Sequence, residues 1–376
     1  MTALPDFRLE AYFSRWEFRA RYHMTASDAQ TVGMDELLAL AGDAERARWE
    51  QLTLGYGETW GSDPLREAIA AGYEGLDAAD VLTFAGAEEA IYCALRVLLS
   101  KDDHAIVSVP NYQSMETLAL ECAGSVTGLA LHASDGWQPD LDEFRAALRP
   151  NTRVVALNFP NNPTGVVARR DTFAAIAAIC EERGIHFFSD EVYRGLERDA
   201  NLRLPQAAEF CRTGLSLNVM SKAYGLPGLR IGWIACRDRA LLSRMERYKH
   251  YLSICNAKPS EVLATIALKA ADTLLTRNRA RCRDNLARLG AFFAAHADRY
   301  AWREPEGGCV GFARYLGSDG VEAHCRALVE EAGVLLLPAS LFESALLPVP
   351  VDRFRVGFGR DGIDAGLAAW GGFLAR

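Results

Sequence analysis

The sequence predicts an α/β protein in which a mostly parallel β-sheet is covered by helices and joined to a smaller α+β unit. From about residue 64 to 260, short apolar runs alternate with helical stretches, a pattern typical of parallel strands joined by helical crossovers. Beyond residue 295 this alternation stops and shorter strand-like runs follow. The chain has 376 residues, half of them hydrophobic, which is enough for two domains and a large core.

Five apolar runs in the alternating region are expected to be strands, over residues 105–109, 153–159, 186–190, 215–220 and 231–236. A helix is expected over 168–183, and a charged helical region over about 240–295. The charges of that region, Lys249 among them, are expected on solvated faces. Runs at 307–315 and 354–358 are expected to be strands of the smaller unit. We predict a large domain over 46–264 and a small domain formed by 1–45 together with 265–376.

Composition excludes several classes of protein. The formal net charge of -8 argues against nucleic acid or an anionic membrane as the main partner. No apolar run is long enough to cross a bilayer and the first residues are charged, so we expect a cytoplasmic location. Nine scattered cysteines without a CxxC pair indicate reduced thiols, and seven histidines without an HExxH pattern give no support for a metal site.

One of only five lysines, Lys222, follows an apolar strand in NVMSKAYGLPGLRIGW. Asn162 follows the run VVALNF, and Asp190 closes IHFFSD with Tyr193 three residues later. Singly, these residues are explained by a turn, a helix cap and an exposed lysine. Together they end neighbouring predicted strands, where ligand sites of open α/β sheets are found. We therefore expect an active site with Lys222 as its amine.

The segments NNPTG, SDEVY and SKAYGLPGLRIGW resemble the cofactor-binding motifs of the class I/II aminotransferases, pyridoxal 5'-phosphate enzymes of fold type I. The resemblance spans nearly the whole chain and includes GYGETWGSDPLREAIA, GAEEA, PNY and FRVGFGR. It implies a large domain with a seven-stranded sheet, a small α+β domain, and pyridoxal 5'-phosphate as cofactor. An amino acid and a 2-oxo acid are the implied substrates, and a homodimer with shared active sites is the implied assembly.

The same resemblance implies roles for individual residues. Lys222 holds the cofactor as a Schiff base and then moves the α-proton of the substrate. Asp190 binds the pyridine nitrogen and keeps it protonated. Asn162 and Tyr193 donate to the phenolic oxygen of the ring, and the ring of Tyr112 stacks on the pyridine face.

For the cofactor phosphate, the resemblance implies a cup made by the amides of Ala87 and Glu88, the hydroxyl of Ser221 and the guanidinium of Arg230. Tyr56 is expected to reach the phosphate of the neighbouring subunit.

Arg355 is expected to hold the substrate α-carboxylate by two parallel hydrogen bonds, with Asn162 beside it. Two positions depart from the family pattern: Val219 replaces a serine three residues before the lysine, and Ala339 replaces a glycine in LPASLF.

Substrate choice is expected to depend on the N-terminal segment YFSRWEFRARYHMTASDAQ. Trp16, Glu17, Arg21 and Asp28 are candidates to line the cleft. An amphipathic helix that docks through Tyr12, Phe13 and Trp16 explains the same segment equally well. Both interpretations stay open at this point.

Transamination is the first function we infer, in which the amino group passes from an amino acid to the cofactor and then to a 2-oxo acid. The alternative is elimination or cyclisation at the β or γ carbon, as in the cyclases that form capreomycidine from a hydroxylated arginine. A sensor domain of a transcription regulator ranks lowest, because the resemblance starts early in the chain and the net charge is acidic.

Overall fold

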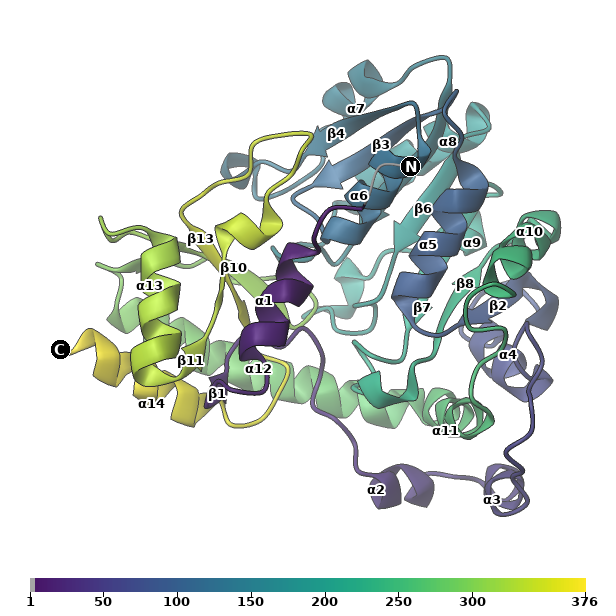
Figure 1. Cartoon of the computed structure of the whole chain (residues 1–376), viewed down its shortest axis with the longest axis horizontal. Coiled ribbons are helices and arrows are strands. Elements are labelled where there is room, and N and C mark those ends of the chain that lie inside the picture. The colour runs from purple at the N-terminus through teal and green to yellow at the C-terminus, as the bar shows by residue number, and fades with distance from the viewer. Residues whose placement is uncertain (1–3) are drawn as a thin grey trace.

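The computed structural model describes residues 4–376, and a twisted seven-stranded sheet forms the centre of its larger part (Figure 1). The strands run in the order β2 (Val81–Phe84), β8 (Gly232–Ala235), β7 (Gly214–Val219), β6 (His186–Asp190), β5 (Thr152–Asn158), β3 (His104–Val109) and β4 (Ser125–Ala130). Neighbours from β7 to β4 pair in parallel, whereas β8 is antiparallel to both β2 and β7. Except for the half-buried edge strand β4, the strands are largely buried, as expected for a sheet with helices on both faces.

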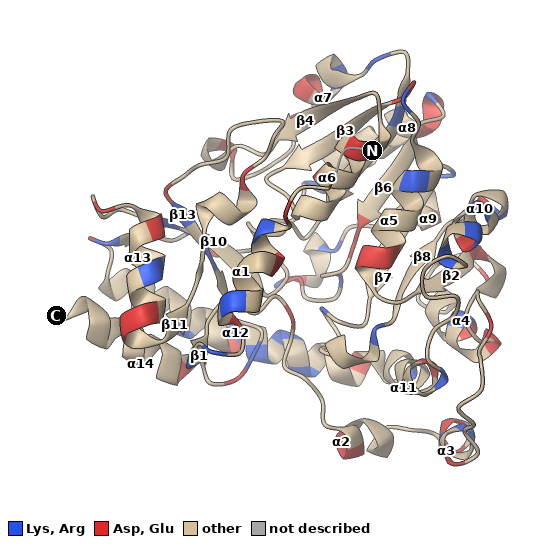
Figure 2. Ribbon diagram, in the orientation of Figure 1, with Lys and Arg blue, Asp and Glu red and all other residues tan. Residues whose placement is uncertain are grey.

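Helices connect and cover these strands. They are α4 (Asp63–Ala70), α5 (Ala87–Leu98), α6 (Gln113–Cys122), α7 (Leu141–Ala147), α8 (Arg170–Glu182), α9 (Ala207–Phe210), α10 (Arg239–Lys249) and α11 (Lys258–Lys269). Figure 2 shows charged residues mainly on helices and loops, with the central sheet largely free of them. Burial of the apolar helix faces against the sheet is the main stabilising contribution to this part of the fold.

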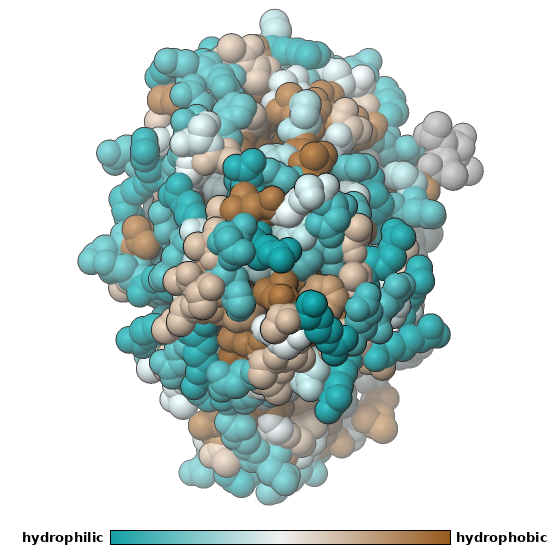
Figure 3. Space-filling model, turned by 90° about the vertical axis from the view of Figure 1, so that its left-hand side faces the viewer, coloured by the Kyte–Doolittle hydropathy of each residue, from teal (hydrophilic) through white to brown (hydrophobic). Residues whose placement is uncertain are grey.

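A second sheet lies in the smaller part, in the order β12 (Leu337–Pro338), β13 (Arg353–Gly357), β10 (Val310–Tyr315) and β9 (Tyr300–Ala301). Its strands pair antiparallel. The helices of this part are α12 (Ala271–Ala295), α13 (Val321–Ala327) and α14 (Ile363–Leu374). Figure 3 views the side on which α13 and α14 lie and shows apolar side chains scattered among polar ones.

The N-terminal segment lies between the two parts (Figure 1). Its helix α1 (Arg8–Trp16) is followed by β1 (Tyr22–His23), which pairs in parallel with β11 (Val334–Leu335) of the smaller part. The chain then passes the edge of the large sheet before α2 (Met34–Ala39) and α3 (Asp43–Glu50). The two-residue pairing of β1 with β11 therefore fixes where this segment crosses the molecule.

The predicted α/β class, the mostly parallel sheet and the five predicted strands are confirmed, with bounds that differ by a few residues. The expectation for Lys249 is wrong, because its side chain, at the end of α10, is fully buried. Its Nζ donates to Asn256 Oδ1 at 2.9 Å and also to the Thr59 carbonyl oxygen. The division into domains at residues 45 and 264 stays a prediction.

Every cysteine among the described residues is a free thiol, and all but Cys255 are buried. Among residues 4–376, no helix is long and apolar enough to cross a membrane. In the same range, no group of three His, Cys, Asp or Glu side chains is placed to hold a metal ion.

Candidate active site

One edge of the large sheet collects the polar residues singled out in the sequence. Strands β5, β6 and β7 are parallel neighbours, so their carboxyl ends lie side by side. Asn158 is paired in register with Asp190, and Lys222 follows the end of β7. Arg230 reaches the same edge because it precedes β8, which runs in the opposite direction.

A cavity of about 360 Å³ opens at this edge, between the large sheet and the N-terminal segment. Its size suits a small-molecule site. Among the residues that line it are Ala87, Glu88, Tyr112, Asn162, Asp190, Tyr193, Ser221, Lys222, Arg230 and Arg355. The structure therefore brings together every residue predicted to hold the cofactor or the substrate carboxylate, except Tyr56.

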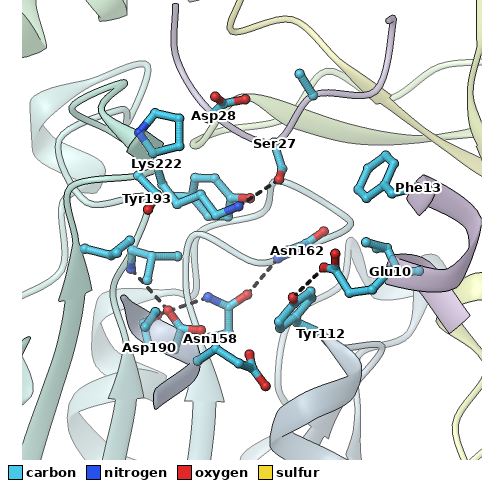
Figure 4. Close-up of a pocket in the computed structure, with 18 of the residues that line it drawn as sticks. Glu10, Phe13, Ser27, Asp28, Tyr112, Asn158, Asn162, Asp190, Tyr193 and Lys222 are labelled. Carbon is cyan, nitrogen blue, oxygen red and sulfur yellow. Dashed lines mark hydrogen bonds between the residues drawn. The ribbon is translucent and has the colours of Figure 1, made fainter. Parts of the chain in front are cut away.

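Lys222 lines the cavity, and its side chain points towards Ser27 (Figure 4). Its Nζ donates a hydrogen bond to Ser27 Oγ at 2.9 Å. Burial lowers the pKa of the amine, opposed by the carboxylate of Asp28. A lysine with a lowered pKa loses its proton more readily, as a nucleophilic amine requires.

Asp190 ends β6 and is buried. Its Oδ1 accepts from the Val192 amide at 3.2 Å, and its backbone oxygen accepts from Asn158 Nδ2 at 3.1 Å. Burial raises the pKa of the carboxyl to about 6, while the Val192 amide and Lys222 act in the opposite direction. A cationic ring nitrogen placed beside this carboxyl would favour its ionised form.

Arg355 comes from β13, and the residue is only 1% exposed. It donates to Asn162 Oδ1 at 3.1 Å and to the Thr25 carbonyl oxygen at 2.9 Å. No carboxylate among the described residues lies within ion-pair distance of it. A buried cation without a counter-ion at the cavity wall is complementary to a carboxylate ligand.

Asn162 and Tyr193 offer further donors to the cavity. Since Asn162 Oδ1 already accepts from Arg355, its side-chain NH₂ is the group left to donate. The Tyr193 hydroxyl is buried and faces Ser27 but makes no hydrogen bond of ordinary geometry within the described chain. Buried hydroxyls are normally paired, so this one indicates a missing ligand oxygen.

An anion cradle lies at the start of α5. Its N-cap is Gly86 with a φ of 95°, and no side chain caps the helix, so the first amides face the cavity without partners from the helix itself. Arg230 Nη1 donates to Ser221 Oγ at 3.3 Å beside it. A Cβ on Gly86 would lie 2.3 Å from Arg230 Nη2, so only glycine leaves room for the guanidinium. Arg230 itself adopts a left-handed backbone with φ 51°.

Three other predicted positions can be placed. The Tyr112 ring lines the cavity, and its hydroxyl donates to Glu10 Oε1 at 3.0 Å. Val219 is buried and also lines the cavity, so it offers no hydroxyl to an anion there. Tyr56 is 88% exposed and lies outside the cavity of its own chain, so its contact with a neighbouring subunit stays a prediction.

The N-terminal segment contributes more of the cavity than its sequence indicates. Glu17 and Asp28 line it as proposed, whereas Trp16 and Arg21 do not. Sequence reasoning missed further lining residues: Glu10, His23, Ser27, Asn158 and Arg360. The position of Glu10 could have been predicted from the sequence, because Glu10, Phe13 and Glu17 are spaced by three and four residues and so share one helix face.

Taken together, the residues fit pyridoxal 5'-phosphate. The anion cradle suits its phosphate, Asp190 its ring nitrogen, Lys222 its aldehyde, and Tyr193 with Asn162 its phenolic oxygen. The unpaired Tyr193 hydroxyl and the space that Gly86 leaves for Arg230 are structural observations that support this fit beside the sequence motifs. The roles of the individual residues stay predictions.

Comparisons with known proteins agree with this fit. The family described as aminotransferase class I and II matches residues 32–362. Capreomycidine synthase of Streptomyces vinaceus is 32% identical over 371 residues, which is 98% of this chain and 93% of that protein.

Two solved structures have the same fold over their full length. A PLP-dependent aminotransferase from Streptococcus suis 89-1591 is 29% identical, with a TM-score of 0.91, covering 100% of this chain and 99% of that one. The PLP-dependent cyclase OrfR is 26% identical, with a TM-score of 0.89, covering 100% and 98%. The chain therefore belongs to the class I and II aminotransferase family and is a pyridoxal 5'-phosphate-dependent enzyme of fold type I.

Proposed function

We propose that this enzyme acts on an amino acid with a cationic, guanidinium-type side chain and cyclises it. The observation that carries the proposal is a pair of carboxylates on the cavity wall, Glu10 in α1 and Glu17 at the C-cap of this helix. Neither lies within ion-pair distance of a Lys or Arg side chain among the described residues. A substrate cation would supply the missing partner.

Most other charged side chains of the cavity have partners or proposed ones, and the remaining carboxyl, Glu88, has a pKa that burial raises to about 7, so it carries less negative charge at neutral pH. Arg360 donates to both Asp28 oxygens, at 3.0 and 2.8 Å. Arg230, Asp190 and Arg355 are assigned above to the phosphate, the ring nitrogen and the α-carboxylate. Glu10 and Glu17 are thus left facing the side chain of the substrate. The same two charges would repel the second carboxylate of 2-oxoglutarate.

The position of these residues along the chain gives further support. The general family match begins at residue 32, after α1 and β1. The match to capreomycidine synthase covers 98% of the chain and so takes in most of this segment. Both carboxylates therefore lie outside the range of the family model and inside the part aligned with capreomycidine synthase, a part that the Streptococcus suis aminotransferase also covers.

His23 stands at the same end of the cavity and supports chemistry on the side chain. Both ring nitrogens are buried without a hydrogen-bond partner in the described chain, and Nε2 lies 3.8 Å from Glu17 Oε1. Burial lowers the pKa of the imidazole to about 4, so the ring is neutral near pH 7. A neutral imidazole can accept a proton from a guanidinium nitrogen as that nitrogen forms a bond.

The reaction balances without an amino acceptor. In a 3-hydroxylated arginine, the C–O bond at Cβ breaks and a bond from a guanidine nitrogen to Cβ forms, with net loss of water. Lys222 removes the α-proton and returns it, and Arg355 holds the α-carboxylate. The cofactor, when bound, delocalises the negative charge that develops at Cα.

The test compares products from two substrates. Purified holoenzyme is incubated with 3-hydroxy-L-arginine alone, and with L-arginine plus pyruvate, and the products are identified by mass spectrometry. We expect a cyclic product lighter by one water in the first reaction and little 2-oxo acid in the second. Formation of 2-oxo acid that depends on pyruvate would instead support transamination, the first inference from the sequence. Lys222→Ala, which lacks the amine, is the control for both.

We also propose that the working form is a homodimer. Tyr56, Leu54 and Tyr251 are 88%, 88% and 91% exposed, an unusual setting for large apolar side chains in a monomer. A second subunit that covers them would bring Tyr56 towards the partner's cofactor. Sedimentation or light scattering of the holoenzyme tests the assembly directly.

A further inference from the structure

We propose that Ser27 is a positioning residue that holds the Lys222 amine when the amine is not bound to the cofactor. Lys222 Nζ donates to Ser27 Oγ at 2.9 Å, and Figure 4 shows the two side chains pointing towards each other across the cavity. The inference applies to transamination and to cyclisation alike, because both require the free amine to move the α-proton.

The backbone around Ser27 is fixed directly on the lysine turn. The Ala29 amide donates to the Lys222 carbonyl oxygen at 3.0 Å, and the Gln30 amide donates to the Gly359 oxygen at 2.8 Å. A Cβ on Gly225 would lie 2.4 Å from the Gln30 oxygen, so the two backbones touch here. Ser27 therefore has a set position relative to Lys222.

The residues on either side of Ser27 are also held. The Thr25 carbonyl oxygen accepts from Arg355, and Asp28 is bound by two hydrogen bonds to Arg360. These contacts come from β13 and the loop that follows it. Ser27 thus lies within a strip of chain, residues 25–30, that is held by hydrogen bonds at both ends.

Ser27 is also the one hydrogen-bond partner that the Lys222 amine has within the described chain. No carboxylate of residues 4–376 lies within ion-pair distance of the amine. Charged and titratable groups that influence it from a greater distance are Asp28, Arg355, Cys309, Glu10, Asp190, Glu88 and Glu17. Tyr193 lines the same cavity. A hydroxyl acceptor at 2.9 Å orients the N–H bonds in a way that these diffuse charges cannot.

Holding the amine matters because a lysine side chain has many rotamers. Proton transfer at Cα requires the nitrogen to stay within hydrogen-bond reach of that carbon's proton. A fixed acceptor reduces the conformations that the amine must search in each turnover. The hydroxyl also favours the protonated amine, because it accepts from the charged form.

The first experiment measures the amine without turnover. The full-length enzyme is stripped of pyridoxal 5'-phosphate, and the rate of its reloading is followed by absorbance across a range of pH for the parent, Ser27→Ala and Ser27→Thr. The rate rises with pH as the amine loses its proton. We expect the midpoint to fall by about half to one pH unit in Ser27→Ala and to stay near the parent value in Ser27→Thr.

The second experiment measures proton transfer. Exchange of the Cα hydrogen of L-alanine in deuterated water is followed by NMR, since a methyl side chain makes no demand on Glu10 or Glu17. We expect exchange to slow by about five- to tenfold in Ser27→Ala, with an unchanged apparent affinity for alanine. Ser27→Thr should retain most of the rate. Ser318→Ala, an exposed serine far from the cavity, is the matched control and should behave as the parent.

Two results would overturn the proposal: a reloading midpoint and exchange rate in Ser27→Ala equal to those of the parent, or a Ser27→Thr variant as impaired as Ser27→Ala. Neither result depends on which amino acid is the natural substrate. Failure of the cyclisation test would leave both measurements intact, so the two proposals are judged separately.

Discussion

Replacement of Glu17 by Gln should remove most of the preference for a cationic side chain while leaving the cofactor site intact. L-arginine and L-citrulline make a suitable pair of ligands, because they differ chiefly in that citrulline carries no charge. The Glu17 side chain is 33% exposed, so its attraction for a cation is partly screened by water. A charge-assisted contact in this setting contributes about 1–2 kcal/mol, which corresponds to a loss of about 5- to 30-fold in the arginine-to-citrulline affinity ratio.

The assay is a titration of the holoenzyme's absorbance with each ligand, at low and high salt. High salt should lower the parent's preference for arginine and have little effect on Glu17→Gln. Glu330→Gln, at an exposed glutamate that does not line the cavity, serves as the charge-matched control. The reasoning would be refuted if the ratio were unchanged in Glu17→Gln, or if both ligands lost affinity equally.

The preference should also depend on pH. Burial raises the pKa of Glu17, with the charge of Glu10 acting in the same direction and Arg360 opposing both. A carboxyl with a raised pKa loses its negative charge at a higher pH than an exposed glutamate does. The arginine preference of the parent should therefore decline as the solution is acidified through this raised pKa, and the decline should be much smaller in Glu17→Gln.

Four further outcomes are expected. Asp190→Asn should lower turnover by at least about a hundredfold with the fold unchanged, since an amide cannot keep the ring nitrogen protonated; steady-state kinetics and circular dichroism check this. Gly86→Ala should weaken cofactor binding at least about tenfold in an absorbance titration, because its Cβ would clash with Arg230 at a positive φ. Burial lowers the pKa of His324 to about 4, so the unfolded state takes up a proton at higher pH than the folded state does. The free energy of unfolding should therefore fall as the pH drops from about 6.5 towards 4. Urea unfolding of His324→Gln should show a shallower dependence of this free energy on pH. Tyr56→Phe mixed with Lys222→Ala should give hybrid dimers with one complete site, and activity that does not exceed the sum of the separate variants would contradict shared sites.

The cofactor half of the site could be predicted because its residues follow strands that the apolar runs of the sequence identify. Asn162, Asp190 and Lys222 follow or end neighbouring parallel strands, so reading where each strand ends places them at one edge. The topology confirms that inference. Local sequence suffices wherever a parallel sheet fixes the positions.

The substrate half could not be predicted in the same way. Ser27 and His23 reach the cavity through the pairing of β1 with β11, more than three hundred residues away in the chain, and no local pattern encodes that contact. Lys249 was misjudged for a related reason: its partners, the Thr59 oxygen and Asn256, come from loops whose positions the helical pattern does not reveal.

The strip from Thr25 to Gln30 bears on how the enzyme could change shape during turnover. It touches the lysine turn at Ala29 and the arginine of β13 at Thr25, a few residues apart along one covalent chain. Any hinge movement of the smaller sheet that carried Arg355 outward would pull on the same strip and so on the hydroxyl beside Lys222. Release of the product carboxylate from Arg355 and loss of the hydrogen bond between Ser27 and Lys222 would then occur in the same movement.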